Sequence, residues 1–494
     1  MCGAMRLYNK MCRGGGYLVL IVFVGVVVSW CGVSGCGARG LSPAHTSKRH
    51  NGAATRGRYI YRLRLADKAG GAFSLEHPRK FLSRKAVERR RRQGCAVDST
   101  DLPVSAAYLD ALRADSMHVV GVSKWNNTVL VSVDDTAAVV GAAKRHPFVL
   151  CAERVYVAPD TVARAPREDN ACDTAFNPWD TIATSPYGVA ERQIRMLGGE
   201  ALHDAGYNAL DMTIAVLDGG FRNADAIPAI KGIRIVGARD FVTGVTDDMY
   251  KATDHGTKVL SVMGTFARNV FIGTAPAARY YLLRCEDNAY EQPVEEDYWV
   301  MAAEYADSVG ADIINSSVGY ALFDGHRGDH RYRELDGHST LISRAASMLV
   351  SKGIVLVCSA GNNGMDPWKK INVPADADSI IAVGAITDKG VNAPFSSVGP
   401  THDGRVKPDV MAPGSPTAVI SGRGNVMHDM GTSFATPVVC GLVACLWQAL
   451  PDKTAAEIIN LVIGSCDNTD CPDNIFGYGV PDFGKAYETG RAEQ

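Results

Sequence analysis

The sequence predicts an α/β domain with a mostly parallel sheet, preceded by a small ferredoxin-like α+β domain. Two apolar runs, 212–217 and 354–358, are rich in β-branched residues and lead into polar residues, which is typical of buried parallel strands. The run 438–447 is apolar on nearly every face of a helix, so this helix should be buried through the core. Residues 58–158 form a separate series of short elements.

The first domain is predicted from the pattern of these short elements. Alternating polar and apolar residues indicate strands, and the pair Asn126-Asn127 indicates a hairpin. The expected strands are 59–65, 119–125, 129–133 and 148–157, and the expected helices are 81–93, 106–114 and 136–145. A β, α, β, β, α, β order of this kind is that of a ferredoxin-like sandwich.

Two titratable residues lie at the ends of elements predicted in the second domain. Asp218 ends the first buried run, so the strand delivers an acid at its carboxyl end. His255 stands just before the helical apolar pattern of residues 256–263. Alone, Asp218 is equally typical of a turn or a cap, and His255 of a structural histidine.

A candidate nucleophile precedes the buried helix. Ser433 lies at the mouth of this helix, where unpaired N–H groups and the dipole favour the negative charge of acyl transfer. Gly431 allows the backbone to approach a substrate closely. An ordinary N-cap serine has the same local pattern.

The segment 431–437, Gly-Thr-Ser-Phe-Ala-Thr-Pro, resembles the nucleophile segment of the subtilisin-like serine proteases, the subtilases of peptidase family S8. The chain order Asp218, His255, Ser433 is also that of the subtilisin arrangement. The resemblance covers about 187–487 and implies a three-layer α/β domain. It also implies that the acid orients the histidine, which acts as general base for the serine.

The resemblance implies further site residues. Asn362, at the end of the buried run 354–358, would donate its side-chain amide to the oxyanion. Two walls would bind the residue before the scissile bond, and they comprise Ser317, Val318, Gly319, Ala360 and Gly361. The family's histidine motif often has a second histidine where this chain has Lys258, a helix-surface position that leaves the catalytic roles unchanged.

The stretch 285–299 is dense in carboxylates and falls, by resemblance, at the edge of the substrate cleft. These groups would favour Lys or Arg upstream of the cut by electrostatic attraction. Alternatively, Glu295, Glu296 and Asp297 begin a helix over residues 297–308, where acids suit the positive end.

Five regions are expected along the chain: a signal peptide (1–35), a tether (36–57), a propeptide domain (58–158), a linker (159–186) and the catalytic domain (187–494). The propeptide assignment rests on the resemblance, and a permanent accessory domain is its alternative. Processing within the linker would be sterically easy.

The N-terminus indicates export. Basic residues precede the apolar run 17–30, which has the length of a signal-peptide core and is too short to span a membrane. The run ends in Val33-Ser34-Gly35-Cys36, which resembles a bacterial lipobox and predicts lipidation of Cys36. An ordinary small-residue cleavage site is the alternative. The expected location is therefore the cell envelope, as a membrane-anchored lipoprotein, or the exterior as a secreted protein.

The charge of the chain limits the partners that are expected, and the positions of its cysteines indicate which of them could pair. The chain has 51 Lys and Arg residues against 53 Asp and Glu, so no nucleic-acid partner is expected. The basic run 84–92 indicates a solvated helix face or a patch that meets an acidic surface of the catalytic domain. Of 13 cysteines, Cys466 and Cys471 are the best disulfide candidates, whereas Cys440 and Cys445 are expected to be buried small hydrophobes.

The function expected from the resemblance is that of an exported serine endopeptidase made as a zymogen. Its partners would be protein or peptide substrates, its own propeptide and a membrane. No cofactor is required, and calcium, which is common in the family, stays open because no loop resembles an EF-hand. The alternatives are an acyl transferase on the same fold and a non-catalytic envelope binding protein.

Overall fold

The computed structural model describes residues 57–159 and 183–493, so the expected signal peptide, Cys36 and most of the linker lie outside the described residues. The described chain divides into two compact units. The small unit comprises residues 57–81 and 98–159, and the large unit comprises 82–97 and 183–493.

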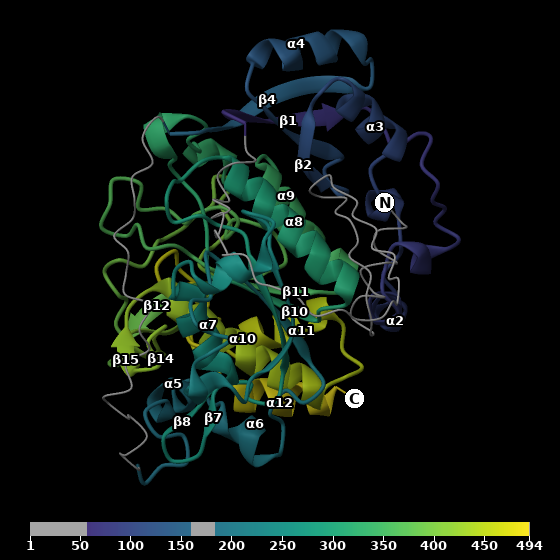
Figure 1. Ribbon diagram of the computed structural model, residues 1–494. Coiled ribbons are helices and arrows are strands. Elements are labelled where there is room, and N and C mark those ends of the chain that lie inside the picture. Colours follow the sequence, from purple (N-terminus) through teal and green to yellow (C-terminus); the bar gives the residue numbers. More distant parts are fainter. Residues whose placement is uncertain (1–56, 160–182, 494) are drawn as a thin grey trace, which may run out of the picture. The chain divides into compact units, whose positions relative to one another are not determined.

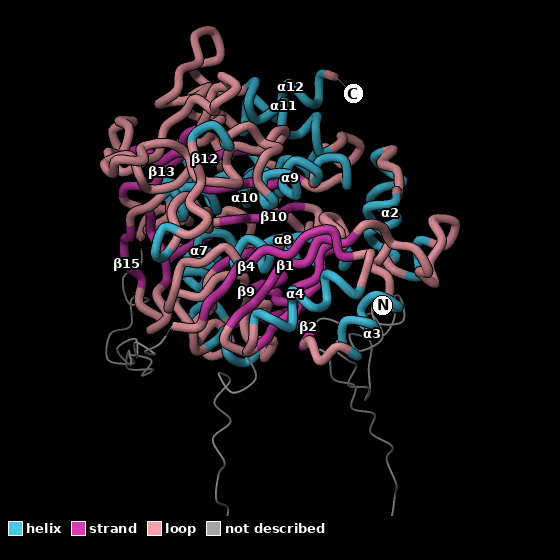
Figure 2. The backbone as a smooth tube through the Cα atoms, turned by 90° about the horizontal axis from the view of Figure 1, so that it is seen from above, coloured by secondary structure: helices cyan, strands magenta, loops and turns pink. Residues whose placement is uncertain are grey.

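The small unit is a four-stranded antiparallel sheet with two α-helices and two short 3₁₀ helices. Its strands are β1 (Tyr59–Leu65), β2 (His118–Ser123), β3 (Thr128–Val133) and β4 (Val149–Val157), and its helices are η2 (Pro78–Lys80), η3 (Ser99–Asp101), α3 (Ala106–Ala114) and α4 (Thr136–Arg145). The sheet order is β2-β3-β1-β4, and β1 and β4 run side by side in Figure 2. This layout confirms the predicted α+β domain.

The core of the small unit comes from one face of each element. Leu63 of β1, Leu109 of α3 and Val131 of β3 are buried together. The hairpin predicted at Asn126-Asn127 joins β2 to β3, and Asn127 adopts φ 51°, a left-handed conformation that asparagine tolerates. The third helix expected in this domain, over residues 81–93, groups instead with the large unit.

The large unit is built on seven parallel strands in the order β13-β12-β11-β10-β5-β9-β6. The strands are β5 (Thr213–Asp218), β6 (Arg234–Asp240), β9 (Arg279–Arg284), β10 (Ile313–Ser316), β11 (Val355–Ser359), β12 (Ile381–Thr387) and β13 (Val410–Ser415). Two short antiparallel pairs are β7 (Phe266–Ala267) with β8 (Phe271–Ile272) and β14 (Thr417–Ile420) with β15 (Val426–Asp429). The prediction of a mostly parallel α/β domain is confirmed.

Helices cover both faces of this sheet, with α8 and α9 on one side and α7 and α10 on the other (Figure 1). The α-helices are α2 (Arg84–Gln93), α5 (Glu191–Arg195), α6 (Glu200–Asp204), α7 (His255–Gly264), α8 (Val294–Val309), α9 (Leu341–Met348), α10 (Thr432–Ala449), α11 (Ala455–Gly464) and α12 (Phe483–Ala492). The short 3₁₀ helices are η5 (Pro228–Ile230), η6 (Thr246–Tyr250), η7 (Asp324–His326), η8 (Tyr332–Glu334) and η9 (Val350–Lys352).

Helix α10 is the central helix of the large unit. Every residue from Thr432 to Trp447 is buried, as its all-round apolar pattern predicts. Within residues 57–159 and 183–493 it is the one helix with the length and composition of a membrane span, and 89% of that stretch is buried inside the protein. Cys440 and Cys445 are fully buried, which confirms their assignment as core residues.

The disulfide expected between Cys466 and Cys471 is wrong. Both residues are free thiols; Cys466 is buried after α11, whereas Cys471 is exposed. The Cys466 thiol donates to the carbonyl oxygen of Val462 at 3.4 Å, one turn earlier in the chain. Proximity in sequence therefore does not bring the two sulfur atoms together, because one faces the core and the other faces water.

Close packing of α10 yields a stability prediction. A Cβ atom on Gly441 would lie 2.0 Å from Oγ1 of Thr274, whose hydroxyl is held by the Pro437 carbonyl at 3.2 Å. We expect Gly441→Ala to lower the free energy of unfolding by about 1–3 kcal/mol. Gly464→Ala is the control, because a Cβ atom at this exposed helical position would meet no neighbouring atom within 4 Å. Its free energy of unfolding should rise by up to about 1 kcal/mol. Equal stability of the two variants in denaturant titrations would contradict the packing argument.

Candidate active site

Asp218 is the last residue of β5, and its side chain is fully buried at the carboxyl edge of the sheet. The backbone N–H of Gly219 donates to its Oδ1 atom at 2.8 Å. A buried carboxylate needs further hydrogen bonds or a cation to offset its desolvation. The histidine that begins the next helix supplies that partner.

His255 is the first residue of α7, and its Nδ1 atom lies 2.9 Å and 3.0 Å from the two carboxylate oxygens of Asp218. Because an ionised carboxylate only accepts hydrogen bonds, Nδ1 carries the proton. In the neutral ring, Nε2 is then the acceptor, which is the tautomer that a general base requires. The His255 side chain is 32% exposed, so solvent reaches the ring.

Four influences set the proton affinity of this ring. Burial lowers the pKa of His255, but the charge and hydrogen bond of Asp218 and the charge of Glu286 raise it, while Lys258 lowers it. The net effect raises the pKa of His255 to about 9. A pKa of about 9 keeps the ring protonated near neutral pH, so the neutral form that can accept a proton predominates only in alkaline solution.

Ser433 is the second residue of α10 and is 7% exposed. Its hydroxyl donates to the Ser317 carbonyl oxygen at 3.1 Å, and the Ser317 hydroxyl donates to the Ser433 carbonyl oxygen at 2.9 Å. The ring of the next residue, Phe434, packs against the ring of His255 with centroids 5.4 Å apart. The start of α10 thus lies against both the end of β10 and the start of α7.

Asn362 follows β11 and is oriented by the residue before Ser433. Its Oδ1 atom accepts hydrogen bonds from the backbone N–H and from the hydroxyl of Thr432, each at 2.9 Å. An N–H group can only donate, so the side-chain oxygen must face Thr432. The amide nitrogen is thereby turned away from Thr432 and kept as a donor at an exposed position.

The two predicted substrate walls lie side by side because β10 and β11 pair in parallel, with Ser316 opposite Cys358. Asn372 joins them: its N–H donates to Ala360 at 3.0 Å, and its side chain donates to Gly319 at 3.4 Å. Gly361 has φ 109°, and a Cβ atom there would lie 2.9 Å from the Asn372 side chain. The structure therefore gathers Gly319, Ala360 and Gly361 around one asparagine, and Ser317 and Val318 directly precede Gly319 in the chain.

Three of the six carboxylates in the acidic stretch, Glu295, Glu296 and Asp297, lie in the first turn of α8, which begins at Val294 and not at residue 297. Glu295 accepts hydrogen bonds from the N–H groups of Asp287 at 2.7 Å and Gln292 at 3.0 Å. Glu296 contacts His330 at 2.7 Å. These carboxylates are committed to the fold, which supports the helix-start interpretation for them.

Three residues with a place in this site were missed by sequence reasoning. Thr432 orients Asn362, Asn372 joins the walls, and Glu286 raises the pKa of His255. Thr432 stands inside the nucleophile segment, so its position was a usable signal. Asn372 lies in a loop that carries no pattern, and Glu286 is one carboxylate among many.

Comparison with known proteins identifies the class to which this fold and site belong. Residues 211–479, more than half of the chain, match the subtilase family, Peptidase_S8. Residues 60–171 match the peptidase S8 propeptide domain of Bacteroidota. The chain therefore belongs to the subtilase family and carries an S8-type propeptide domain.

The chain is also similar to individual proteins. The chain is similar to Subtilisin NAT of Bacillus subtilis subsp. natto, with 29% identity over 338 residues that cover 68% of this chain and 74% of the relative. It is also similar to Serine protease AprX of Bacillus subtilis (strain 168), with 31% identity over 299 residues, 54% of this chain and 64% of that protein. Among solved structures, the prenylagaramide maturation protease PagA is 25% identical and covers 60% of this chain and 99% of its own, with a TM-score of 0.48.

The charges around His255 predict the direction in which its titration moves. Glu286→Gln removes a negative charge that favours the imidazolium ion, so the pKa should fall below about 9. Lys258→Met removes a positive charge that opposes it, so the pKa should rise. The measurement is the NMR titration of the imidazole resonance that disappears in His255→Gln. Shifts of both variants in the same direction would contradict this account.

Proposed function

We propose that the protein is a serine endopeptidase made as a zymogen, with Asp218, His255 and Ser433 as its catalytic residues. The observation that carries the proposal is the Asp218–His255 contact of 2.9 Å, together with the packing of Phe434, the residue after Ser433, against the His255 ring. Family membership and the propeptide match support the same reaction class.

In the proposed reaction, the Ser433 hydroxyl leaves the Ser317 carbonyl and donates to Nε2 of His255 as it attacks the substrate carbonyl carbon. The oxygen–carbon bond forms while the proton passes to the ring, and Asp218 stabilises the resulting imidazolium ion. The ring then gives this proton to the leaving amine, which departs and leaves an acyl-enzyme on Ser433. Water then attacks the ester. His255 takes a proton from this water and returns it to the Ser433 oxygen as the acyl group leaves.

The negative charge on the substrate oxygen would be stabilised by the Asn362 amide nitrogen and the Ser433 backbone N–H. Asn362 needs no reorganisation for this role, because Thr432 already fixes its oxygen at 2.9 Å. Substrate backbone would pair with the two walls as an added strand. Glu286, whose charge acts on His255, is one remaining candidate for a preference for basic residues upstream of the cut.

Regulation by the N-terminal region is part of the proposal. Residues 58–158 would be the propeptide, and residues 159–186 the segment in which it is cut; the family match over 60–171 supports this.

We also propose export by residues 1–35, with lipid attachment at Cys36 and a location at the cell envelope. This rests on the sequence Val33-Ser34-Gly35-Cys36. A wild-type N-terminal fragment whose mass is that of the unmodified sequence, with no lipid increment at Cys36, would refute the anchor.

Removal of the proposed oxyanion donor should affect turnover. In subtilisin, loss of one such donor costs about 10²–10³ in kcat, and we expect Asn362→Ala to fall in this range with a smaller change in KM. Asn363→Ala is the matched control, because its side chain contacts Asp366 at 3.2 Å on the loop. The measurement is kcat for peptide hydrolysis by the two variants. Equal values would show that Asn362 does not stabilise the oxyanion.

Self-processing tests the nucleophile and the zymogen together. Wild type and Ser433→Ala are expressed from residue 37, and intact masses are compared. We expect only the wild type to lose about 120 to 150 residues from its N-terminus, since the cut should fall in the linker. Loss of the same segment from Ser433→Ala in purified protein would show that another protease processes the chain. A peptide-cleavage assay then decides the activity of Ser433 directly.

A further inference from the structure

Helix α2 is the part of the N-terminal sequence that groups with the large unit. It begins after Ser83, whose hydroxyl accepts from the Ala86 N–H, and ends at Gly94 in a left-handed conformation. Although the helix is very basic, it has a buried face that holds Arg89 and Arg90, which are 3% and 1% exposed. A solvated basic face therefore does not describe these two arginines.

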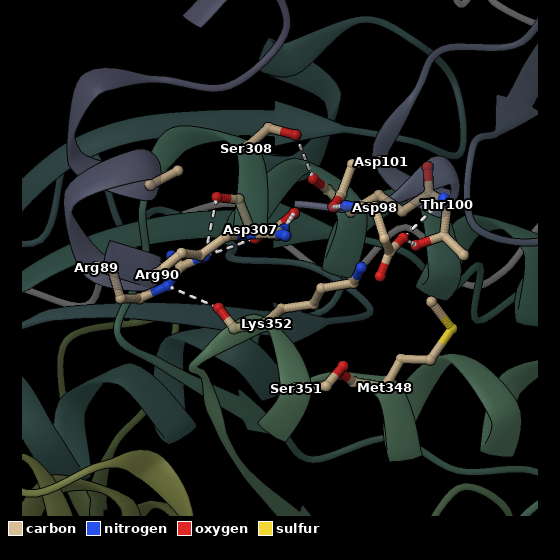
Figure 3. Close-up of polar contacts among 12 residues, drawn as sticks. Arg89, Arg90, Asp98, Thr100, Asp101, Asp307, Ser308, Met348, Ser351 and Lys352 are labelled. Carbon is tan, nitrogen blue, oxygen red and sulfur yellow. Dashed lines mark hydrogen bonds and ion pairs between the residues drawn. The ribbon is translucent and has the colours of Figure 1, made fainter. Parts of the chain in front are cut away.

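The buried arginines meet a buried acid in the last turn of α8. Asp307 is fully buried; Nη2 of Arg89 lies 2.5 Å from its Oδ1 atom, and Nη2 of Arg90 lies 2.8 Å from Oδ2 (Figure 3). A carboxylate at this position is doubly unfavourable, because it is desolvated and stands at the negative end of a helix. The two guanidinium groups offset both effects.

Arg89 also binds backbone carbonyl groups from two other parts of the large unit. It donates to Ala311 at 2.6 Å, just after α8, and to Lys352 at 3.2 Å, at the end of η9 (Figure 3). The chain turns through Gly310 after α8, and a Cβ atom there would lie 2.8 Å from Cβ of Lys85. Two helix C-termini thus form the surface that binds α2. We call this surface, which comprises Asp307, Ala311 and Lys352, the seat.

The ends of α2 extend the same contact. Nζ of Lys85 lies 2.7 Å from Asp312 and 2.6 Å from the hydroxyl of Thr213, at the starts of β10 and β5. The Gln93 side chain donates to the Gly353 carbonyl at 2.9 Å, shortly before β11 begins, and accepts from the Ala455 N–H at 2.8 Å. One helix therefore contacts the amino ends of three neighbouring central strands.

We propose that the seat around Asp307 is a specific binding site for helix α2, through which the N-terminal region stays bound after the chain is cut and holds the starts of β5, β10 and β11 in place. The occupant is a basic helix with two adjacent arginines on its buried face. This deepens the proposed zymogen function, but the seat exists whether or not the protein cleaves itself.

The test uses the full chain with Ser433→Ala and an inserted site for a site-specific protease between residues 165 and 175. After cutting, the dissociation constant of the two fragments is measured. We expect Arg89→Met with Arg90→Met to raise it at least 100-fold, because a buried carboxylate loses its partners. Arg91→Met with Arg92→Met is the matched control on the same helix, where both arginines are exposed, and should stay within about threefold. An unchanged constant for the first pair would overturn the proposal.

A compensating variant covers the case in which the arginine variant does not fold. Adding Asp307→Met to Arg89→Met and Arg90→Met removes the buried charge together with its partners, which is often neutral or better. Folding and fragment binding should recover toward those of the parent chain. Failure of this triple variant to recover, while the Arg91 and Arg92 control folds, would show that the ion pair is not the anchor.

Hydrogen exchange in the uncut chain gives a local readout. The Arg89 and Arg90 variant should exchange amide hydrogens at the starts of β5, β10 and β11 at least tenfold faster than the parent. Strand β12 serves as the internal reference. Uniform exchange in all four strands would contradict the role of α2 at the strand starts. Because no step requires catalysis, this result is independent of the protease proposal.

Discussion

The reciprocal hydrogen bonds between Ser317 and Ser433 are the contact on which the geometry of the site depends. They join the end of β10 to the first turn of α10 at 2.9 Å and 3.1 Å. Because α10 is buried along nearly its whole length, its position is fixed by the core and not by the site. The serine is therefore held by packing, while its hydroxyl is held by one carbonyl, which it would exchange for the ring of His255 in the proposed mechanism.

Two buried acids of the large unit share one arrangement. Each faces cationic or polar groups that come from another element: Asp218 faces His255, and Asp307 faces two arginines. Such pairings are costly to form and more costly to break, because a remaining partner keeps its desolvation penalty. Charge pairs of this kind specify which elements meet more than they add to net stability.

The sequence allowed prediction of the features that have a local or periodic signal. The parallel strand before Asp218, the buried helix after Ser433 and the four strands of the small unit all show patterns that burial imposes on neighbouring residues. What was missed depends on contacts between distant segments. Thr432 stands in the nucleophile segment, but its contact with Asn362 spans 70 positions, and no local pattern pairs the two residues. The disulfide at Cys466 failed for the same reason, since spacing does not report which way a side chain faces.

The two ends of the sheet give the proposed zymogen a physical rationale. Strand β5 has six residues, so its ends are about 20 Å apart, with Asp218 at one end and the contact of Lys85 with Thr213 at the other. A slip of one residue along a strand turns each side chain to the opposite face, so Asp218 would turn away from His255. A helix that fixes the strand starts consequently protects the site geometry without touching the reacting groups. On this argument, helix α2 contributes to assembly of the proposed active site from the amino ends of the strands, opposite to Asp218.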